Sequence, residues 1–347
     1  MDSAGTKIAL EPRSLCQRCV LPESRPDIWL DSSGVCNICH EFDKQKDANP
    51  PVKFLESDFV KILDQNKSRG RYDCLVMCSG GKDSTAALYY MKKRYKLNPL
   101  AFTFDHGFET EDALENIHNA VRILGVDLLL FKSDFMKEMF AAIVKGGDKA
   151  VLCHPCSIWY MGLTFEMAAR FDIPMIVAGW TKGQVMHQPL ASRCGCNTRQ
   201  AEFVSMSKAT REFLDRYTRQ NLKYKDFPRS MEEVLNIAKK RHKATVVSPH
   251  WFLPMDPAVY VEILKKELNW KFPRFSYPGS STNCYLNFLS VYRSMKDFGY
   301  THYHVEMSKM IRGSLLSRSE ALKLLEINFG QDLLKRVMQK LEQDEGA

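Results

Sequence analysis

The order of apolar and polar residues predicts alternating strands and helices in the central part of the chain. Short apolar runs of the kind found in buried strands occur at residues 74–78, 99–104, 128–131 and 175–178. Segments with helical periodicity lie between them, at residues 84–96, 111–124, 135–144 and 157–170. This alternation predicts an α/β fold, in which a doubly wound parallel sheet carries helices on both faces.

The segments that precede this core have different patterns. Residues 1–50 are rich in Cys, Pro, Asp and Ser and short of helical periodicity, whereas residues 51–70 combine a linker with an amphipathic helix. The apolar side of that helix is formed by Phe54, Phe59, Val60, Ile62 and Leu63. We therefore expect a chain of four parts, which span residues 1–50, 51–70, 71–255 and 256–347.

The second half of the chain is less regular. The pattern predicts a basic helix at residues 207–222, a further strand at 246–252, and a helix at 256–268 that Asp256 and Pro257 begin. Residues 189–200 have the composition of an irregular loop. Helices follow to the end, so residues 256–347 form a mainly helical region that we expect to complete the active site.

The composition is that of a soluble globular protein, with 45% hydrophobic and 26% charged residues in 347. The chain has no run of about 18 apolar residues and starts without the apolar core of a signal peptide. We therefore expect a cytoplasmic protein that does not associate with a membrane. The net charge of +8 suits an anionic small substrate or a nucleotide. RNA is permitted but not favoured, because no RNA-binding module is recognisable.

A glycine-rich segment, Ser79-Gly80-Gly81-Lys82-Asp83-Ser84, follows the first predicted strand and begins a helix. The glycines allow backbone N–H groups to turn toward an anion, and the helix dipole adds positive charge at the same place. Lys82 supplies a mobile cation, and the two serine hydroxyls supply donors. These residues do not match the Walker motif of other phosphate-binding loops. The sequence therefore predicts a phosphate site for ATP, with Asp83 as a partner of Mg²⁺ or of Lys82, or simply as a charge at the helix N-terminus.

Other candidate residues follow neighbouring strands, whose carboxyl ends meet at one edge of a parallel sheet. Asp105 follows the second strand and is predicted to hold the adenosine part of ATP; a turn or cap residue is the alternative. Gly179 follows the fourth strand and is predicted to border the nucleotide. Lys182 and Gln184, just beyond it, are weaker candidates for the same cleft.

Eleven cysteines in a cytosolic chain indicate metal or redox chemistry rather than disulfides. Cys16 and Cys19 form one C-x-x-C pair, and Cys36 and Cys39 form a second pair sixteen residues later. This spacing is typical of a zinc ribbon, with residues 31–34 as the turn between its halves. Four thiolates leave zinc no open position, so we expect a folding role; reduced structural thiols are the alternative.

A second cysteine group is predicted around Cys153 and Cys156. Both come immediately before a predicted helix, where the dipole favours thiolate, and Cys284 lies in a polar Ser-Thr-Asn setting. Three such cysteines would ligate three irons of a [4Fe–4S] cluster and leave the fourth open for substrate or sulfide. Alternatives are a trio with Cys194 or Cys196 in place of Cys284, a second zinc, or unligated cysteines.

The glycine-rich segment resembles the PP-loop of the ATP pyrophosphatases, which hold the β- and γ-phosphates of ATP and release pyrophosphate. Over nearly its full length the chain also resembles the N-acetyl sugar amidotransferase family of PP-loop enzymes. The segments that carry this likeness are residues 31–36, 72–76, 98–105, 153–156, 171–176, 269–273 and 310–321. The resemblance implies the adenine nucleotide alpha hydrolase-like fold and an enzyme that uses ATP with Mg²⁺.

The same resemblance implies a reaction. Such an enzyme adenylates a carbonyl oxygen of a free or nucleotide-linked N-acetyl sugar, and ammonia from a separate glutaminase then displaces AMP, in bacterial polysaccharide biosynthesis. Lys82 and Asp83 would be catalytic. This amidotransferase interpretation is our leading expectation from the sequence.

One departure from the sugar enzymes leads to an alternative. Cys284 stands where they are not expected to have a cysteine, and with Cys153 and Cys156 it is similar to the cluster site of PP-loop tRNA thiolation enzymes. In those enzymes sulfur on the cluster's open iron attacks the adenylated carbonyl, so the three cysteines would be catalytic. The alternative is thus a sulfurtransferase that acts on tRNA or a small molecule with a separate sulfur donor. A non-catalytic nucleotide-binding module is a second alternative, and a homodimer is compatible with all three.

Overall fold

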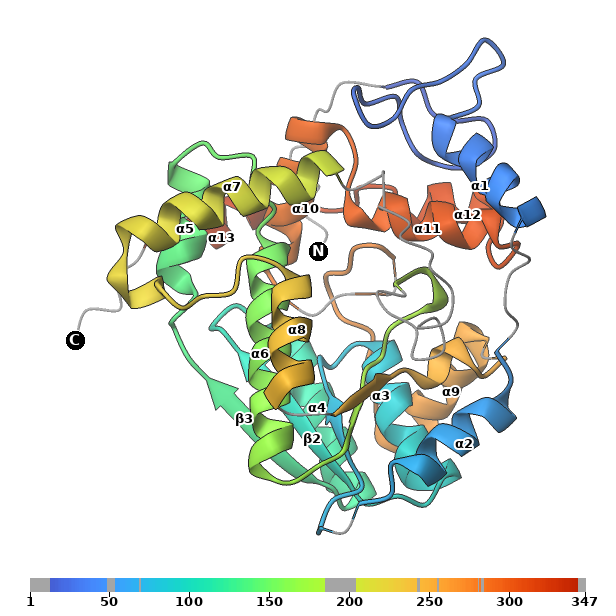
Figure 1. Cartoon of the computed structure of the whole chain (residues 1–347), viewed down its shortest axis with the longest axis vertical. Coiled ribbons are helices and arrows are strands. Elements are labelled where there is room, and N and C mark those ends of the chain that lie inside the picture. Colours follow the sequence, from blue (N-terminus) through green and yellow to red (C-terminus); the bar gives the residue numbers. More distant parts are fainter. Residues whose placement is uncertain are drawn as a thin grey trace.

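The centre of the molecule is a parallel sheet of five strands in the order β3-β2-β1-β4-β5. The computed structural model describes residues 13–48, 54–68, 70–184, 204–241, 244–254, 256–279, 281 and 284–342 (Figure 1). The strands are β1 (Cys74–Met77), β2 (Pro99–Asp105), β3 (Asp127–Lys132), β4 (Met175–Val177) and β5 (Thr245–Val247). The chain starts in the middle, proceeds to one edge, and then returns to build the other side. This is the predicted doubly wound topology.

The two faces of the sheet carry separate hydrophobic cores. Along β1, Leu75 and Met77 belong to one core, while Cys74 and Val76 belong to the other, as the pleat requires. The second core contains residues of the helices α2 (Glu56–Gln65), α3 (Lys82–Tyr89), α4 (Glu111–Leu124) and α9 (Pro257–Leu268). In Figure 1, α2, α3 and α9 lie together on this side.

The first core is larger because the C-terminal helices join it. Its helices are α5 (Lys137–Lys145), α6 (Cys153–Arg170), α7 (Val204–Gln220), α8 (Met231–Arg241), α10 (Leu286–Phe298), α11 (His302–Arg312), α12 (Arg318–Leu324) and α13 (Gln331–Glu342). The prediction of a helical C-terminal region is therefore confirmed. No described helix combines the length and the apolar character needed to cross a bilayer.

Several predicted elements differ in extent. The strand predicted at residues 246–252 ends at Val247, because Pro249 has no N–H for the ladder and a short 3₁₀ turn, η6 (Pro249–Trp251), follows. The helix predicted at 84–96 is α3 followed by a π-helical turn, η1 (Tyr90–Arg94). Val60, placed on the apolar side of α2, is instead 41% exposed. The predicted irregular loop at residues 189–200 lies outside the described residues.

The helix predicted at residues 157–170 starts earlier, as α6, at Cys153. Pro155 is tolerated there because the first turn of a helix needs no N–H partner. Cys153 and Cys156 are therefore part of the helix rather than residues that precede it.

The N-terminal region packs against the C-terminal helices. Its helix α1 (Asn37–Ala48) was not indicated by the sequence, whereas a bridge between Leu30 and Cys36 closes the expected turn. Arg318 of α12 donates from Nε to the carbonyl oxygens of Cys16 (3.1 Å) and Cys19 (2.9 Å). These bonds attach the cysteine turn to the helices beside the active site.

Candidate active site

A cavity of about 340 Å³ opens at the carboxyl ends of β1, β2 and β4. In open α/β sheets this position, where the strand order reverses, is where ligands bind. Its wall combines the glycine-rich loop, represented by Ser79, Gly81, Asp83 and Ser84, with the three thiols of Cys153, Cys156 and Cys284. Residues that are up to 205 positions apart in the chain thus share one small volume.

The glycine-rich loop is closed by its own hydroxyls. The Ser84 hydroxyl accepts from the backbone N–H of Ser79 (3.1 Å) and donates to the carbonyl of Gly81 (3.2 Å). Gly81 is the N-cap residue of α3, so the free N–H groups of the first helical turn point toward the cavity end of β1. This arrangement suits the phosphates of a nucleotide.

Two predicted site glycines, Gly80 of the loop and Gly179 after the fourth strand, are required by close contacts. Gly80 has φ +75°, and a Cβ there would stand 2.2 Å from the carbonyl oxygen of Ala113. At Gly179, a Cβ would stand 2.5 Å from the backbone nitrogen of Ser84. Helix α4 and the end of β4 therefore touch the loop backbone directly, which only glycine permits.

Distant residues that the sequence did not indicate also hold the loop. Trp270 Nε1 (3.0 Å) and Asn116 Nδ2 (3.3 Å) both donate to the carbonyl oxygen of Gly80. His250 Nε2 lies 2.9 Å from the carbonyl oxygen of Asp83. Trp270 belongs to one of the segments that carry the family resemblance. Neither periodicity nor spacing in the sequence shows that its indole N–H reaches the loop.

Lys82 and Asp83 form an ion pair at 2.6 Å, with both side chains largely buried. Tyr260 of α9 donates a hydrogen bond to the other carboxylate oxygen of Asp83. Burial raises the pKa of Asp83, but nearby Lys82 and the other polar contacts outweigh burial and lower it below its ordinary value. Asp83 is therefore ionised at neutral pH and holds the Lys82 ammonium beside the loop.

The other strand-end candidates lie near the cavity to different degrees. Gly179 and Gln184 line it, and Gln184 Nε2 donates to Glu306 of α11 (2.9 Å). Asp105 accepts from the N–H of Gly107 (2.8 Å) in the turn after β2, while its neighbour His106 lines the cavity. Lys182 lies in the 3₁₀ turn η2 (Lys182–Gln184). Their contact with ATP stays a prediction.

The cysteine trio lines the same cavity as the phosphate loop. Burial raises the pKa of the Cys153, Cys156 and Cys284 thiols, whereas the sequence predicted that the start of a helix would favour thiolate at Cys153 and Cys156. A metal would have to displace these protons on binding. The trio with Cys194 or Cys196 lies outside the described residues.

Two further polar residues, Glu109 and His106, line the cavity close to the thiols. Glu109 pairs with Cys284 in an antiparallel bridge, and its carboxyl lies 3.3 Å from His106 Nε2. Burial raises the pKa of Glu109 well above its ordinary range and lowers the pKa of His106 to about 4. His106 is therefore neutral at pH 7. Neither His106 nor Glu109 was predicted from the sequence to be a site residue.

Residues 73–151, from β1 to just before α6, match the family model described as queuosine biosynthesis protein QueC. The matched segment contains the glycine-rich loop, whose geometry is described above. The chain contains a PP-loop ATP pyrophosphatase domain. The predicted superfamily and fold are thereby confirmed, and with them an adenylating enzyme of the ATP-using PP-loop class.

Similar proteins extend beyond this domain. An uncharacterized protein of Methanocaldococcus jannaschii is 24% identical over 313 residues, which are 90% of this chain and 92% of that protein. The solved U34-tRNA thiolase NcsA from Methanococcus maripaludis, with its [4Fe–4S] cluster, is similar at 12% identity and a TM-score of 0.35, over 97% of this chain and 93% of that one. The NMN synthetase from Francisella tularensis has 11% identity and a TM-score of 0.37, over 83% and 95%.

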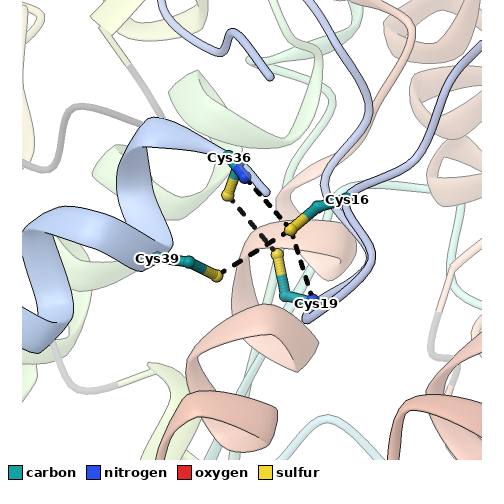
Figure 2. A group of neighbouring side chains, drawn as sticks. All are labelled: Cys16, Cys19, Cys36 and Cys39. Carbon is teal, nitrogen blue, oxygen red and sulfur yellow. Dashed lines mark hydrogen bonds between the residues drawn. The ribbon is translucent and has the colours of Figure 1, made fainter. Parts of the chain in front are cut away.

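The four N-terminal cysteines form a second, separate site. Their sulfurs all lie within 4.8 Å of one another, and Figure 2 shows them pointing toward a common centre. Cys16 Sγ is 4.0 Å from Cys39 Sγ, and Cys19 Sγ is 3.7 Å from Cys36 Sγ. A tetrahedral ion with metal–sulfur bonds of about 2.3 Å has edges of about 3.8 Å, so the four sulfurs fit one ion. Backbone N–H groups of Cys19 and Cys36 point at Cys16 Sγ as additional donors.

The Cys153, Cys156 and Cys284 trio differs from the N-terminal group in spacing. Among the described residues, only the N-terminal cysteines form a group whose ligand atoms all lie within 4.8 Å of one another, as a single ion requires. This spacing disfavours a second zinc in the cavity. Thiolates on a cluster bind different irons and stand farther apart. One buried polar atom of the cavity wall, His106 Nδ1, has no hydrogen-bond partner within the described part of the chain. Unmet bonds of this kind are expected around a bound group.

Proposed function

We propose that this PP-loop enzyme is a sulfurtransferase. It adenylates a carbonyl oxygen of its acceptor with ATP and then replaces AMP with sulfur supplied at Cys153, Cys156 and Cys284. The observation that carries the proposal is that these three thiols share one cavity with the phosphate loop. An amide or ring carbonyl, on RNA or on a small molecule, is the acceptor class that needs such activation.

The first half-reaction depends on the loop. A carbonyl oxygen leaves poorly until it is transferred to the α-phosphorus, after which it departs as part of AMP. Loop N–H groups and Lys82 neutralise the phosphate charge, and Mg²⁺ would assist them. Because Asp83 already holds Lys82 at the loop, little rearrangement is needed when ATP binds.

The second half-reaction depends on the cysteine trio. A [4Fe–4S] cluster held by the three thiolates would supply sulfur from the iron that no cysteine binds. Buried Glu109 and neutral His106, with the aromatic side chains of Phe104 and Tyr160, keep this part of the cavity poorly hydrated. A poorly hydrated cavity protects an adenylated carbonyl from hydrolysis.

The amidotransferase expected from the sequence uses the same first half-reaction. Attack by ammonia gives no role to three cysteines in the cavity, which is why sulfur is the preferred nucleophile. An N-acetyl sugar acceptor, with a glutaminase as partner, remains the second candidate. A separate sulfur donor replaces the glutaminase in the preferred proposal.

For the N-terminal site we propose Zn²⁺ with a folding role. Four thiolates complete its coordination, and Arg318 joins the metal-binding turn to α12. The ion would therefore stabilise the contact between the N-terminal region and the helices beside the cavity.

The proposal is tested by supplying both nucleophiles to both acceptor classes. Anaerobically reconstituted protein is incubated with ATP, Mg²⁺, and either total RNA or nucleotide-linked N-acetyl sugars, with sulfide or with ammonium. We expect AMP and pyrophosphate in equal amounts, with labelled sulfur in the acceptor, and no turnover by Lys82→Ala. AMP formation that requires an N-acetyl sugar and ammonium, with no incorporated sulfur, would establish the amidotransferase instead.

A further inference from the structure

The carboxylate of Asp83 is held from outside the phosphate loop by Tyr260. One of its oxygens lies 2.6 Å from Lys82 Nζ, and the other accepts a hydrogen bond from the Tyr260 hydroxyl. All three side chains are enclosed, because those of Lys82 and Asp83 are 14% and 17% exposed and Tyr260 is 3% exposed. Hydrogen bonds to a carboxylate in such surroundings are among the stronger ones in proteins. The hydroxyl therefore restrains the carboxylate that pairs with the lysine.

The start of α9 fixes the position of this hydroxyl. Pro257 begins the helix, and the carboxylate of Asp256 caps it by accepting from the N–H of Ala258 (2.9 Å). Tyr260 lies in the first turn, where the centroid of its ring is 5.8 Å from that of His250. A capped first turn with a buried ring leaves the hydroxyl little freedom. The helix thus presents the donor to the loop.

Tyr260 differs in one respect from the other distant residues that hold the loop. Trp270 Nε1 and His250 Nε2 both contact backbone carbonyl oxygens, at 3.0 Å and 2.9 Å. Those two contacts fix the path of the loop backbone. The Tyr260 hydroxyl instead contacts a side chain, the one that pairs with the Lys82 ammonium. Its effect is therefore on the position of the cation.

We infer that Tyr260 is a positioning residue of the adenylation step. Its hydroxyl restrains the Asp83 carboxylate, which in turn keeps the Lys82 ammonium beside the loop that receives the phosphates of ATP. A cation that is already anchored loses less freedom when the nucleotide binds. The inference rests on the adenylation half of the proposed function and is independent of whether sulfur or ammonia attacks.

The test compares Tyr260→Phe with Tyr72→Phe in the full chain. Tyr72 is also buried, and its hydroxyl donates to the carboxylate of Asp127 (2.7 Å) at the amino end of β3. Its variant therefore controls for loss of a tyrosine–carboxylate bond away from the cavity. Calorimetry measures the affinity for α,β-methylene ATP with Mg²⁺, for each variant alone and combined with Asp83→Ala. Mass spectrometry measures the rate at which acetic anhydride acetylates Lys82 in the absence of nucleotide.

We expect Tyr260→Phe to weaken binding of the analogue about tenfold, the factor that corresponds to a hydrogen bond to a charged group. It should also raise the acetylation rate of Lys82, because the carboxylate that restrains the ammonium is less well held. When Asp83→Ala is already present, Tyr260→Phe should have no further effect on affinity, because the hydroxyl acts through that carboxylate. Tyr72→Phe should match the wild type in both measurements.

Two results would overturn the inference. One is an unchanged acetylation rate of Lys82 in Tyr260→Phe, and the other is an equal loss of affinity with and without the Asp83 carboxylate, as a purely structural role would give. The acetylation rate decides the question even if the Asp83→Ala protein binds the analogue too weakly to measure. A wild type that does not bind the analogue would instead refute the adenylation step of the proposed function.

Discussion

At the scale of single residues, the phosphate loop depends on the space around its glycines. Gly80 and Gly107 both adopt positive φ, +75° and +86°, but their surroundings differ. A Cβ at Gly107 would meet nothing within 4 Å, whereas a Cβ at Gly80 would collide with the backbone of Ala113. A substitution at Gly107 therefore causes backbone strain alone, whereas one at Gly80 also disturbs the close packing of α4 against the loop.

Replacement of each glycine by alanine should therefore have different results. Gly107→Ala should lower the free energy of unfolding by about 1–2 kcal/mol, the usual cost of left-handed backbone, and leave ATP binding intact. Gly80→Ala should destabilise the protein further and abolish ATP binding, because α4 must move away from the loop. Urea unfolding and calorimetric titration with a non-hydrolysable ATP analogue measure both effects. Equal affinities in the two variants would contradict this account of the loop.

At the scale of elements, the segment after α9 supports the loop from 190 positions away. Trp270→Phe keeps the ring but removes the N–H that binds the Gly80 carbonyl, and leaves that oxygen with the longer bond from Asn116. Loss of a hydrogen bond worth about 1 kcal/mol should weaken the affinity for ATP roughly fivefold. The matched control is Trp251→Phe, which loses a bond to the Thr181 carbonyl instead. An unchanged affinity in Trp270→Phe would show that the loop holds its shape alone.

Helix α11 has a cap that acid should disrupt. His304 Nδ1 accepts from the N–H of Thr301 (3.2 Å), and burial lowers the pKa of His304 to about 4. Unfolded histidine binds a proton below pH of about 6.5, so the stability due to neutral His304 is complete above that pH and is lost between about 6.5 and 4.

His304→Gln tests this pH dependence, because glutamine keeps an acceptor at the capping-box position and does not titrate. Between pH 7.5 and pH 5, the free energy of unfolding should fall by about 2 kcal/mol less in the variant than in the wild type. Urea unfolding curves at the two pH values provide the comparison. The other buried histidines are present in both proteins. The pKa of His302, which burial lowers, is also lowered by the charge of His304. Parallel losses would mean that His304 is not neutral in the folded state.

Elements that depend on local sequence were predicted correctly, whereas contacts between distant elements were not. The strands, the phosphate loop and the paired cysteines follow from local patterns, because period, glycine and spacing are local properties. The contacts of Trp270 and Tyr260 do not, because they depend on how distant segments pack on the sheet. Likewise, the termination of β5 at Val247 reflects Pro249, whereas the start of α6 at Cys153 reflects tolerance of proline in a first turn.

At the scale of the whole molecule, both cysteine sites contact the C-terminal helices. The N-terminal site contacts α12 through Arg318 and α11 through a bond from the Val20 N–H to the Ser308 hydroxyl (3.4 Å). Helix α11 also carries His302 and Tyr303, which line the cavity. The metal-binding turn therefore supports the helix that forms part of the active-site wall.

Loss of the N-terminal ion should loosen this contact. Cys36→Ser should reduce zinc from about one ion per chain to none, lower the melting temperature, and make the first 48 residues the earliest site of limited proteolysis. Cys74→Ser, a buried cysteine of β1 outside both sites, should keep its zinc and the protease resistance of that region. If Cys36→Ser resists protease as the wild type does, the folding role is refuted.

The central claim is that the cavity cysteines hold a cluster distinct from the N-terminal ion, and metal analysis of three anaerobically reconstituted proteins tests it most directly. The wild type should contain about four irons, four sulfides and one zinc per chain. Cys284→Ser should lose the iron and keep the zinc, whereas Cys36→Ser should lose the zinc and keep the iron. A wild type without iron, or iron that remains in Cys284→Ser and disappears from Cys36→Ser, would contradict the account.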